Sequence, residues 1–454
     1  MNRCVAVFDV GKTNIKLVVF DHGGAVLAER SAPNTPLAAD EQWPYLRLDT
    51  EGAWTFLTNA LRELGARFSI EAIVTTTHGC AGVLMGRDGE AVPPLDYEFD
   101  GFAAVDTAYD AARPPFDESR SPHLPRGLNL GRHIFYYERH FPDQFKQATA
   151  FLTYAQYFAW RLGGAMASEV TSLGAHTDLW RPNEGELSSM VDTLGWRRLF
   201  PPIRKAWDTL GTLKPEVAAA TGLSPNLRIV CGAHDSNASL VPHLTSRGDP
   251  FTVISTGTWV IIMAVGGTAP LDPEADMLAN VDVRGTPVPT ARFMGGREYS
   301  VLAGDAPTEA NEADVDAIIA SGALALPAFS DQGGPFASRK GVIEGPAPTT
   351  PKARAALATI YSALMTAHML RRLEAPGDLI VEGGFTRSPA FAALLARLMA
   401  GRRVLIAPMS AGAAAGAAML AHWDEPHPPP LLEPARAWDL PGLEAHQDQW
   451  ERAL

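Results

Sequence analysis

The sequence predicts an α/β protein of two related domains that face one another across a cleft, and three observations support this. Residues 4–30 alternate short apolar runs with the turns GKTN and HGG, which is typical of three strands. Residues 251–267 repeat this strand-turn-strand pattern, with FTVIS and WVIIMAV as the strands and TGT as the turn. The chain has 454 residues, about three times the length typical of one domain. We expect a first domain at 1–245, a second at 246–425 and a Pro-rich C-terminal extension at 426–454.

The remaining elements follow from periodicity and from helix-start signals. Apolar residues at helical spacing predict helices over 51–68, 146–163 and 352–373, whereas 71–79 reads as a buried strand that runs into a loop. Four prolines make 111–128 irregular. The strand DLIVEGG precedes Ser388-Pro389, a pair that favours the start of a helix. A strand RRVLIAP and a small-residue helix SAGAAAGAAMLAH complete this pattern.

Composition excludes several classes of protein. A hydrophobic fraction of 46% and a charged fraction of 20% are those of a globular chain. The 38 Lys and Arg against 51 Asp and Glu give a net charge of −13, which repels nucleic acid and anionic membranes. Cys4, Cys80 and Cys231 show neither disulfide nor zinc spacing. With no segment that reads as a signal peptide or membrane span, we expect a cytoplasmic protein.

The turn at Gly11-Lys12-Thr13 superficially resembles a nucleotide-binding P-loop. That motif needs a glycine where Ala6 stands, and a helix where the pattern predicts a second strand. The alternative is a tight hairpin in which Gly11 takes a positive φ and the Thr13 hydroxyl points at a phosphate. A plain hairpin turn, with Asp9 as a solvated strand end, stays open.

Two further glycine turns suggest that the first is part of a nucleotide site. Ser255-Thr256-Gly257-Thr258 repeats the hydroxyl-rich turn between two buried strands, so the two turns together predict a pair of phosphate clamps. Gly383-Gly384 follows a strand and precedes a helix, where absent side chains would let a sugar or a flat ring lie against the backbone. The alternative for this pair is a tight strand-to-helix turn.

The segment CGAHDSNAS, residues 231–239, is predicted to place His234 and Asp235 at the end of a strand. An aspartate beside a substrate hydroxyl can accept its proton while the oxygen attacks phosphorus. The alternative is that Asp235 caps the helix that follows through its amides, a role compatible with catalysis.

Four motifs in this order resemble the FGGY carbohydrate kinases: D-x-G-x-T-x-x-K at Asp9 to Lys16, GAHD ending at Asp235, STGTW at 255–259 and GGFTRSP at 383–389. The resemblance covers roughly residues 4–422. It implies two ribonuclease H-like domains of the actin-like, hexokinase-like superfamily. It also implies transfer of the γ-phosphoryl group of ATP, with Mg²⁺, to a hydroxyl of a small sugar, usually a ketose. The motifs GKTN, GTW and GAHDSNAS look nearest to the L-rhamnulose and L-fuculose kinases.

The resemblance also implies roles for single residues. Asp235 matches the general base, and Asp9 and Asp235 match the metal carboxylates, Asp9 acting through water. The nucleotide-binding residues implied by the match are Thr13, Asn14, Lys16, Thr256, Gly257, Thr258, Gly383, Gly384 and Ser388. Lys12 and Phe385 depart from the commoner motif: the cation could reach a phosphate or point to solvent, and the ring could pack on adenine.

The sugar site is expected at His78, Asp96, Tyr97 and His234. His78 follows a buried strand, where this family binds substrate, although a satisfied loop histidine is the alternative. A plain surface turn is the alternative for Asp96 and Tyr97. Two other functions stay open, a catalytically silent sugar-sensing protein and an actin-like ATPase that acts on a partner protein. Association into a homodimer also stays open.

Overall fold

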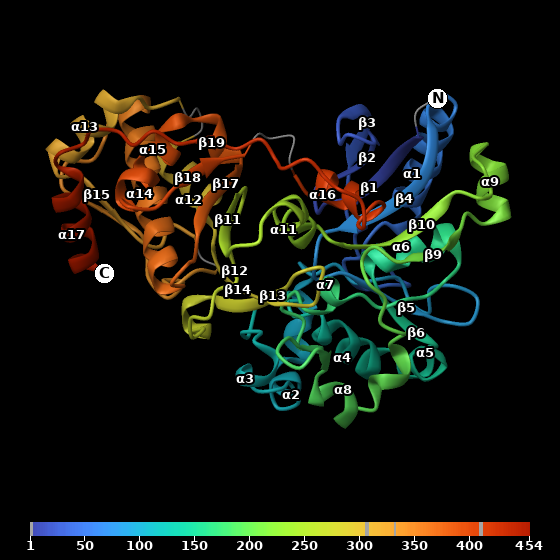
Figure 1. Cartoon of the computed structure of the whole chain (residues 1–454). Coiled ribbons are helices and arrows are strands. Elements are labelled where there is room, and N and C mark those ends of the chain that lie inside the picture. The colour runs from blue at the N-terminus through green and yellow to red at the C-terminus, as the bar shows by residue number, and fades with distance from the viewer. Residues whose placement is uncertain (1–2, 305–307, 331–332, 408–411) are drawn as a thin grey trace. The chain divides into compact units, whose positions relative to one another are not determined.

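The structure is a computed structural model that describes residues 3–304, 308–330, 333–407 and 412–454 (Figure 1). Contacts divide the chain into two compact units. The first comprises residues 1–246, 279–287 and 412–429, and the second comprises 247–278, 288–411 and 430–454. These ranges differ from the predicted ones because the chain returns twice to the first unit, and because 430–454 packs with the second unit. Among the described residues, no helix is long and apolar enough to cross a bilayer.

The first unit is built on a six-stranded sheet in the order β3-β2-β1-β4-β10-β9. β1, β2 and β3 form the predicted antiparallel meander, whereas β4 pairs parallel with both β1 and β10. The strands of this sheet are β1 (Arg3–Val10), β2 (Asn14–Asp21), β3 (Val26–Pro33), β4 (Ser69–Thr77), β9 (Thr209–Thr212) and β10 (Arg228–His234).

Side chains along β1 point alternately to the two faces of the sheet, one of which packs in the hydrophobic core. Ala6, Phe8 and Val10 pack in one apolar cluster with residues of α1 (Thr50–Gly65) and α6 (Tyr154–Gly163). Because successive side chains of a strand point to opposite faces, Asp9 lies on the other face. Elsewhere the unit contains α2 (Asp106–Asp110), α3 (Phe116–Ser119), α4 (Gly131–His140), α5 (Pro142–Gln147), α7 (Val170–Leu173), α8 (Ser189–Thr193), α9 (Pro215–Thr221), α10 (Asp235–Ala238), α11 (Val241–Ser246), α16 (Ala413–Leu420), β7 (Trp180–Arg181) and β8 (Glu186–Leu187).

A seven-stranded sheet in the order β13-β14-β12-β11-β17-β18-β19 belongs mainly to the second unit, since β13 continues into residues 279–281, which count with the first. β11 pairs antiparallel with β12 and parallel with β17, so the predicted second strand-turn-strand pattern is confirmed. The elements of this sheet and of the second unit are β11 (Phe251–Thr256), β12 (Val260–Val265), β13 (Met277–Val281), β14 (Pro287–Phe293), β15 (Leu324–Leu326), β16 (Val342–Glu344), β17 (Asp378–Gly383), β18 (Val404–Ile406), β19 (Glu433–Pro434), α12 (Gly295–Ala303), α13 (Glu312–Ser321), α14 (Pro351–Arg372), α15 (Pro389–Leu398) and α17 (Leu443–Ala453).

Two expectations from the sequence are corrected. The helix expected over 146–163 is interrupted by β6 (Ala150–Thr153), which pairs antiparallel with β5 (Gly82–Met85). That distant partner stabilises a strand inside a helical pattern. The C-terminal extension expected at 426–454 is part of the second unit from residue 430 on, because it supplies β19 to the second sheet and buries Trp450 of α17.

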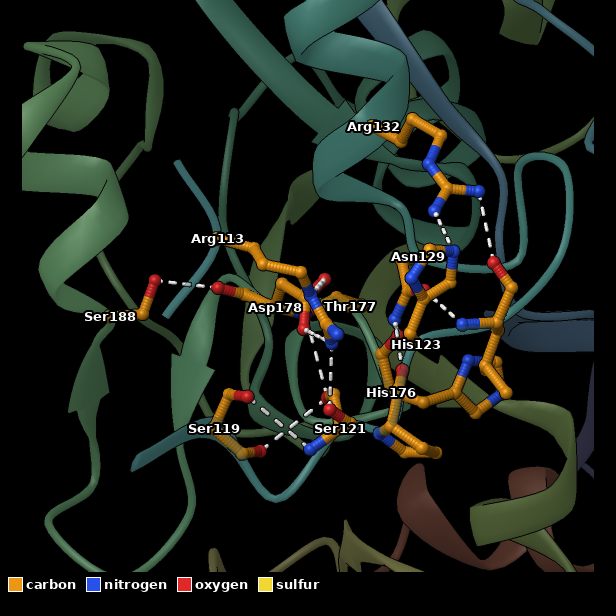
Figure 2. Close-up of polar contacts among 12 residues, drawn as sticks. Arg113, Ser119, Ser121, His123, Asn129, Arg132, His176, Thr177, Asp178 and Ser188 are labelled. Carbon is orange, nitrogen blue, oxygen red and sulfur yellow. Dashed lines mark hydrogen bonds and ion pairs between the residues drawn. The ribbon is translucent and has the colours of Figure 1, made fainter. Parts of the chain in front are cut away.

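A buried polar network holds the Pro-rich segment 111–128, which is irregular as predicted apart from α3 (Figure 2). At its centre, the Arg113 guanidinium donates to both carboxylate oxygens of Asp178, at 2.8 and 3.2 Å. Burial raises the pKa of Asp178, and Arg113 opposes that rise. Nearby, Asn129 donates to the carbonyls of Pro122 and His176, which ties the segment to the chain preceding Asp178.

Replacing Arg113 by Met should lower the free energy of unfolding by about 3–5 kcal/mol, because it leaves the buried Asp178 carboxylate without its cation. Urea denaturation measures the change. The matched control is Arg120→Met, since Arg120 pairs with Asp117, whose side chain is 90% exposed, and such pairs contribute at most about 1 kcal/mol. Equal effects of both variants would contradict the role assigned to the buried pair.

Candidate functional site: carboxylates at the ends of parallel strands

The predicted residues of the first unit gather at one edge of its sheet. Asp9 is the penultimate residue of β1, His78 follows β4, and Asp235 follows β10. These strands run parallel, with β4 between the other two. Their carboxyl ends therefore meet at one edge, which is where open α/β sheets bind ligands.

Asp9 lies in an environment that favours a cation. Burial raises the pKa of Asp9 to about 7, and the negative charge of Asp235 adds to the rise. Lys16, the partner of Asp9 across the β1–β2 pair, opposes it. A desolvated carboxylate beside a second carboxylate is stabilised by a bound divalent cation, and oxygen ligands of this kind suit Mg²⁺.

Asp235 is the more accessible of the two carboxylates, with 26% of its side chain exposed. It is the first residue of the four-residue α10, and the N-cap position belongs to His234. Asp235 Oδ1 accepts hydrogen bonds from the amide and hydroxyl of its neighbour Ser236, at 2.5 and 3.2 Å. Asp235 is therefore not the N-cap residue, although it accepts one amide of the first turn, and the bonds to Ser236 fix the orientation of its carboxylate.

His78 presents one nitrogen without a protein partner to this edge. Its Nδ1 lies 2.8 Å from the carbonyl oxygen of Gly79, whereas its buried Nε2 has no hydrogen-bond partner among the described residues. Burial lowers the pKa of His78, which favours the neutral ring. A neutral ring that donates from Nδ1 carries its lone pair on Nε2. His78 can therefore accept a hydrogen bond from a ligand hydroxyl.

Asp96 is buried, so the surface-turn alternative for it is wrong. Its carboxylate accepts hydrogen bonds from Lys12 Nζ at 2.5 and 2.6 Å and from the Glu98 amide at 2.8 Å. Lys12 also lies 3.1 Å from the Glu98 carboxylate and 4.6 Å from the centre of the Tyr97 ring. Lys12 thus neither reaches for a phosphate nor points freely to solvent, because it neutralises Asp96.

The first turn is tight and exposed. The Gly11 amide donates to the Asn14 carbonyl at 2.9 Å, and the Asn14 side chain donates to Thr13 Oγ1 at 3.1 Å. Gly11 is not among the residues with positive φ, contrary to expectation. The position has little room for a side chain, since a Cβ there would lie 3.0 Å from the Asn14 oxygen.

In the second unit, the Thr256 hydroxyl makes structural hydrogen bonds, and the phosphate-binding role of the turn stays a prediction. This hydroxyl donates to the Glu382 carbonyl at 2.5 Å and accepts from the Phe385 amide at 3.0 Å. The hydroxyl therefore joins β11 to the turn after β17. Gly257 and Thr258 are exposed, and the Gly257 amide closes the turn on the Trp259 carbonyl at 2.8 Å.

Gly383 is required by its neighbour on β11. It adopts φ +84°, and a Cβ there would lie 2.1 Å from the Thr256 oxygen. Beyond it, Gly384 and Ser388 line a cavity of about 250 Å³, together with the aromatic rings of Phe385 and Phe391. Ser388 is also the N-cap of α15 and accepts from the Ala390 amide, as predicted. The cavity combines a glycine turn with an apolar wall, which suits a flat ring.

Comparisons with known proteins decide the family. The N-terminal domain of the FGGY family of carbohydrate kinases matches residues 131–242, and the carbohydrate kinase FGGY C-terminal domain matches residues 248–429. A carbohydrate kinase from Novosphingobium aromaticivorans, known by its crystal structure, is 34% identical over 100% of this chain and 98% of its own, with a TM-score of 0.90. The chain belongs to the FGGY family of carbohydrate kinases.

Other FGGY proteins extend the comparison. L-fuculokinase of Salmonella typhi is 25% identical over 58% of this chain and 57% of its own length. The Escherichia coli K12 L-fuculokinase is 23% identical over 60% and 61%. The match to these curated relatives thus spans about 60% of their length. Xylulose kinase from Rhodospirillum rubrum, 19% identical with a TM-score of 0.79 over 99% of this chain and 98% of its own, shares the two-domain actin-like, hexokinase-like fold.

FGGY sugar kinases use ATP with Mg²⁺. The residues of this chain fit both. Asp9 and Asp235 offer the oxygen donors that Mg²⁺ takes, and the pKa of Asp9 is raised by burial first and by the negative charge of Asp235 second. The cavity beside Gly384 offers an apolar wall to a nucleotide base.

Sequence reasoning missed several residues that shape this FGGY site. Tyr299, Thr359 and Phe391 line the cavity beside Gly384 but come from α12, α14 and α15. Gly296 lies against the turn after β11, where a Cβ would lie 2.0 Å from the Gly257 oxygen. The MGG segment before Arg297 was the available signal for this close approach, but nothing in the sequence says which turn it meets.

His234 is positioned by a residue that the sequence did not single out. Its backbone amide donates to Thr171 Oγ1 at 2.9 Å, and Thr171 in turn donates to Glu169 at 2.6 Å. The His234 Nε2 lies 3.3 Å from Asp235 Oδ1 and packs against Gly79, where a Cβ would come within 2.8 Å. His234 therefore links the end of β10 to the loop that carries His78.

Proposed function

We propose that this protein phosphorylates a hydroxyl of a small sugar, a ketose of the L-fuculose or L-rhamnulose type, with ATP as the phosphoryl donor. The pair of carboxylates at the edge of the first sheet carries the proposal. One, Asp9, is desolvated with a pKa of about 7, whereas Asp235 is the more accessible. That difference suits two tasks, cation binding for Asp9 and contact with substrate for Asp235.

In the proposed reaction, the Asp235 carboxylate accepts the proton of the sugar hydroxyl. The hydroxyl oxygen forms a bond to the γ-phosphorus, and the bond from that phosphorus to the β–γ bridging oxygen breaks, so that the electron pair leaves with ADP. His78 Nε2 accepts a hydrogen bond from a second sugar hydroxyl, and Asp96, Tyr97 and His234 form the rest of the sugar site. Bound Mg²⁺ would neutralise phosphate charge and would be held by Asp9, through water, with Asp235.

The nucleotide is proposed to bind the turns at Thr13-Asn14 and Gly257-Thr258 through its phosphates. Gly383, Gly384 and Ser388 would lie along its adenosine. Thr256 acts through its bonds to Glu382 and Phe385, which position this turn, and Lys16 tunes the charge beside Asp9. The predicted cleft between the two domains stays a prediction.

A coupled assay of ADP release tests the proposal. Ketopentoses, 6-deoxyketohexoses and tetritols are compared with a sample that lacks sugar. We expect release that depends on sugar and is fastest with a 6-deoxyketohexose. ADP release of the same rate without sugar would favour the actin-like ATPase, and sugar binding without ADP release would favour the sensing protein.

Lys12→Met should raise the KM for the sugar by about 10-fold, because it leaves the buried Asp96 carboxylate without its cation and loosens the loop that carries Tyr97. Steady-state kinetics at saturating ATP measures the change. The matched control is Glu98→Gln, which removes only the half-exposed partner of Lys12 and should leave KM within about 2-fold. An unchanged KM in Lys12→Met would exclude the Lys12–Asp96 pair from sugar binding.

A further inference from the structure

A second group of polar side chains lies at the opposite edge of the first sheet from Asp9 and Asp235. It lines a hollow of about 490 Å³ whose residues include Arg3, Glu71 and Arg228, which lie at or near the amino ends of β1, β4 and β10. Strands of seven to nine residues separate the two edges, which is roughly 20–25 Å at the usual rise per residue. The group therefore stands apart from the proposed active site.

Three side chains in this hollow bring metal-binding atoms together. His22 comes from the turn between β2 and β3, and His422 and Glu425 come from the segment after α16. Their ligand atoms all lie within 4.8 Å of one another. His22 Nε2 is 3.1 Å from one Glu425 oxygen, and His422 Nδ1 is 3.1 Å from the other. Ligand atoms about 2.0–2.1 Å from a tetrahedral zinc ion are themselves about 3.3 Å apart, so the two 3.1 Å distances fit such an ion.

The second nitrogen of His422 supplies independent support. His422 Nε2 lies 3.0 Å from a Glu71 carboxylate oxygen. Glu71 lies in turn within 3.5 Å of Arg3 and 4.0 Å of Arg228, whose guanidinium donates to the carbonyl of Ala421. Metal-binding histidines almost always donate their other ring N–H to a carboxylate or carbonyl, which fixes the tautomer and the ring orientation.

The contacts of His422 suit a metal ligand that is held by a positioning carboxylate. His422 faces a carboxylate from each ring nitrogen. With a metal on Nδ1, the neutral ring satisfies Glu71 with its Nε2–H and leaves Glu425 free to bind the same ion together with His22.

We propose that His22, His422 and Glu425 bind one divalent transition metal ion of the zinc type, with Glu71 as the residue that positions His422. Two imidazoles and one carboxylate are ligands that zinc accepts, and water completes four-coordination. The ion would join the β2–β3 turn to residues 412–429, which return to this unit late in the chain. Its role is therefore structural.

The experiment titrates Zn²⁺ into the full-length protein, prepared without a polyhistidine tag and freed of metal by a chelator, with Mg²⁺ in excess. Calorimetry should show one saturable equivalent. His22→Ala and His422→Ala should each weaken Zn²⁺ binding by at least about 100-fold, and Glu71→Gln by about 10- to 100-fold. Because His22 lies in an exposed turn, His22→Ala is expected to fold, as judged by an unchanged melting temperature without metal.

Two controls separate this site from other histidines and from the proposed catalytic carboxylates. His123→Ala removes a half-exposed histidine 3.1 Å from Asp110 in the same unit, and it should leave Zn²⁺ affinity unchanged. Asp9→Asn should also leave it unchanged. The absence of a saturable Zn²⁺ equivalent, or equal affinity in the wild type and His22→Ala, would overturn the proposal, as would loss of binding in Asp9→Asn.

A spectroscopic readout completes the test. Co²⁺ in place of Zn²⁺ should give visible absorption bands of the strength typical of four-coordinate cobalt, and these bands should be lost in His22→Ala. Bands that persist in His22→Ala would show that the ion lies elsewhere and would overturn the assignment.

Discussion

Asp235→Asn should lower kcat by about 10²–10⁴ while the protein keeps its affinity for ATP. An asparagine preserves the size of the side chain and can still accept the bonds from Ser236 that orient it. It cannot take a proton from a sugar hydroxyl at neutral pH. The loss should therefore fall on turnover and leave the fold intact.

Single-turnover kinetics with saturating sugar and ATP measures this effect. The control is Asp208→Asn, which removes a carboxylate of the same unit that pairs with Arg204 at 2.8 Å and lies outside the proposed site. Calorimetric titration with ATP and the melting temperature establish that both variants fold and bind nucleotide. If Asp235→Asn turns over as fast as the wild type, Asp235 is not the general base.

Gly257→Val should weaken ATP binding by more than about 100-fold, which corresponds to about 2.7 kcal/mol. A Cβ on residue 257 would have the Trp259 oxygen as its nearest neighbour, at 3.9 Å, and Gly257 does not adopt a positive φ. The fold should therefore tolerate a side chain at this position. The added methyl groups would occupy the exposed side of the turn, where the proposed phosphate approaches the backbone.

The matched control for this substitution is Gly248→Val. Gly248 belongs to the same unit, a Cβ there would meet nothing within 4 Å, and its φ is also ordinary. Calorimetry with ATP and Mg²⁺ compares the two variants, with circular dichroism as the test of folding. Unaltered ATP affinity in Gly257→Val would exclude this turn as a phosphate clamp. Gly383 is unsuitable for such a test, because its backbone conformation and its contact with Thr256 both require glycine.

Local signals in the sequence predicted the central strands of both sheets and several of the helices that accompany them. Val- and Ile-rich runs broken by glycine turns predicted β1 to β3 and β11 to β12, and the pair Ser388-Pro389 predicted the start of α15. Each of these signals acts within a few residues, so it survives in the sequence alone. The motifs singled out Asp9 and Asp235, and the position after a buried strand singled out His78; the structure places all three at one edge of the first sheet.

Long-range packing decided what the sequence could not. β6 forms inside a helical pattern because β5 pairs with it, and the Pro-rich end of the chain adds β19 to the second sheet. Lys12 binds Asp96, 84 positions away, and the Thr256 hydroxyl bonds to Glu382 in β17 and to Phe385 just after it. The ring of His22 contacts the ring of His422, which lies 400 positions later in the chain. A local pattern shows that such side chains are polar and where their strands end, but their partners are chosen only when distant segments pack, because burial requires each polar group to find a partner.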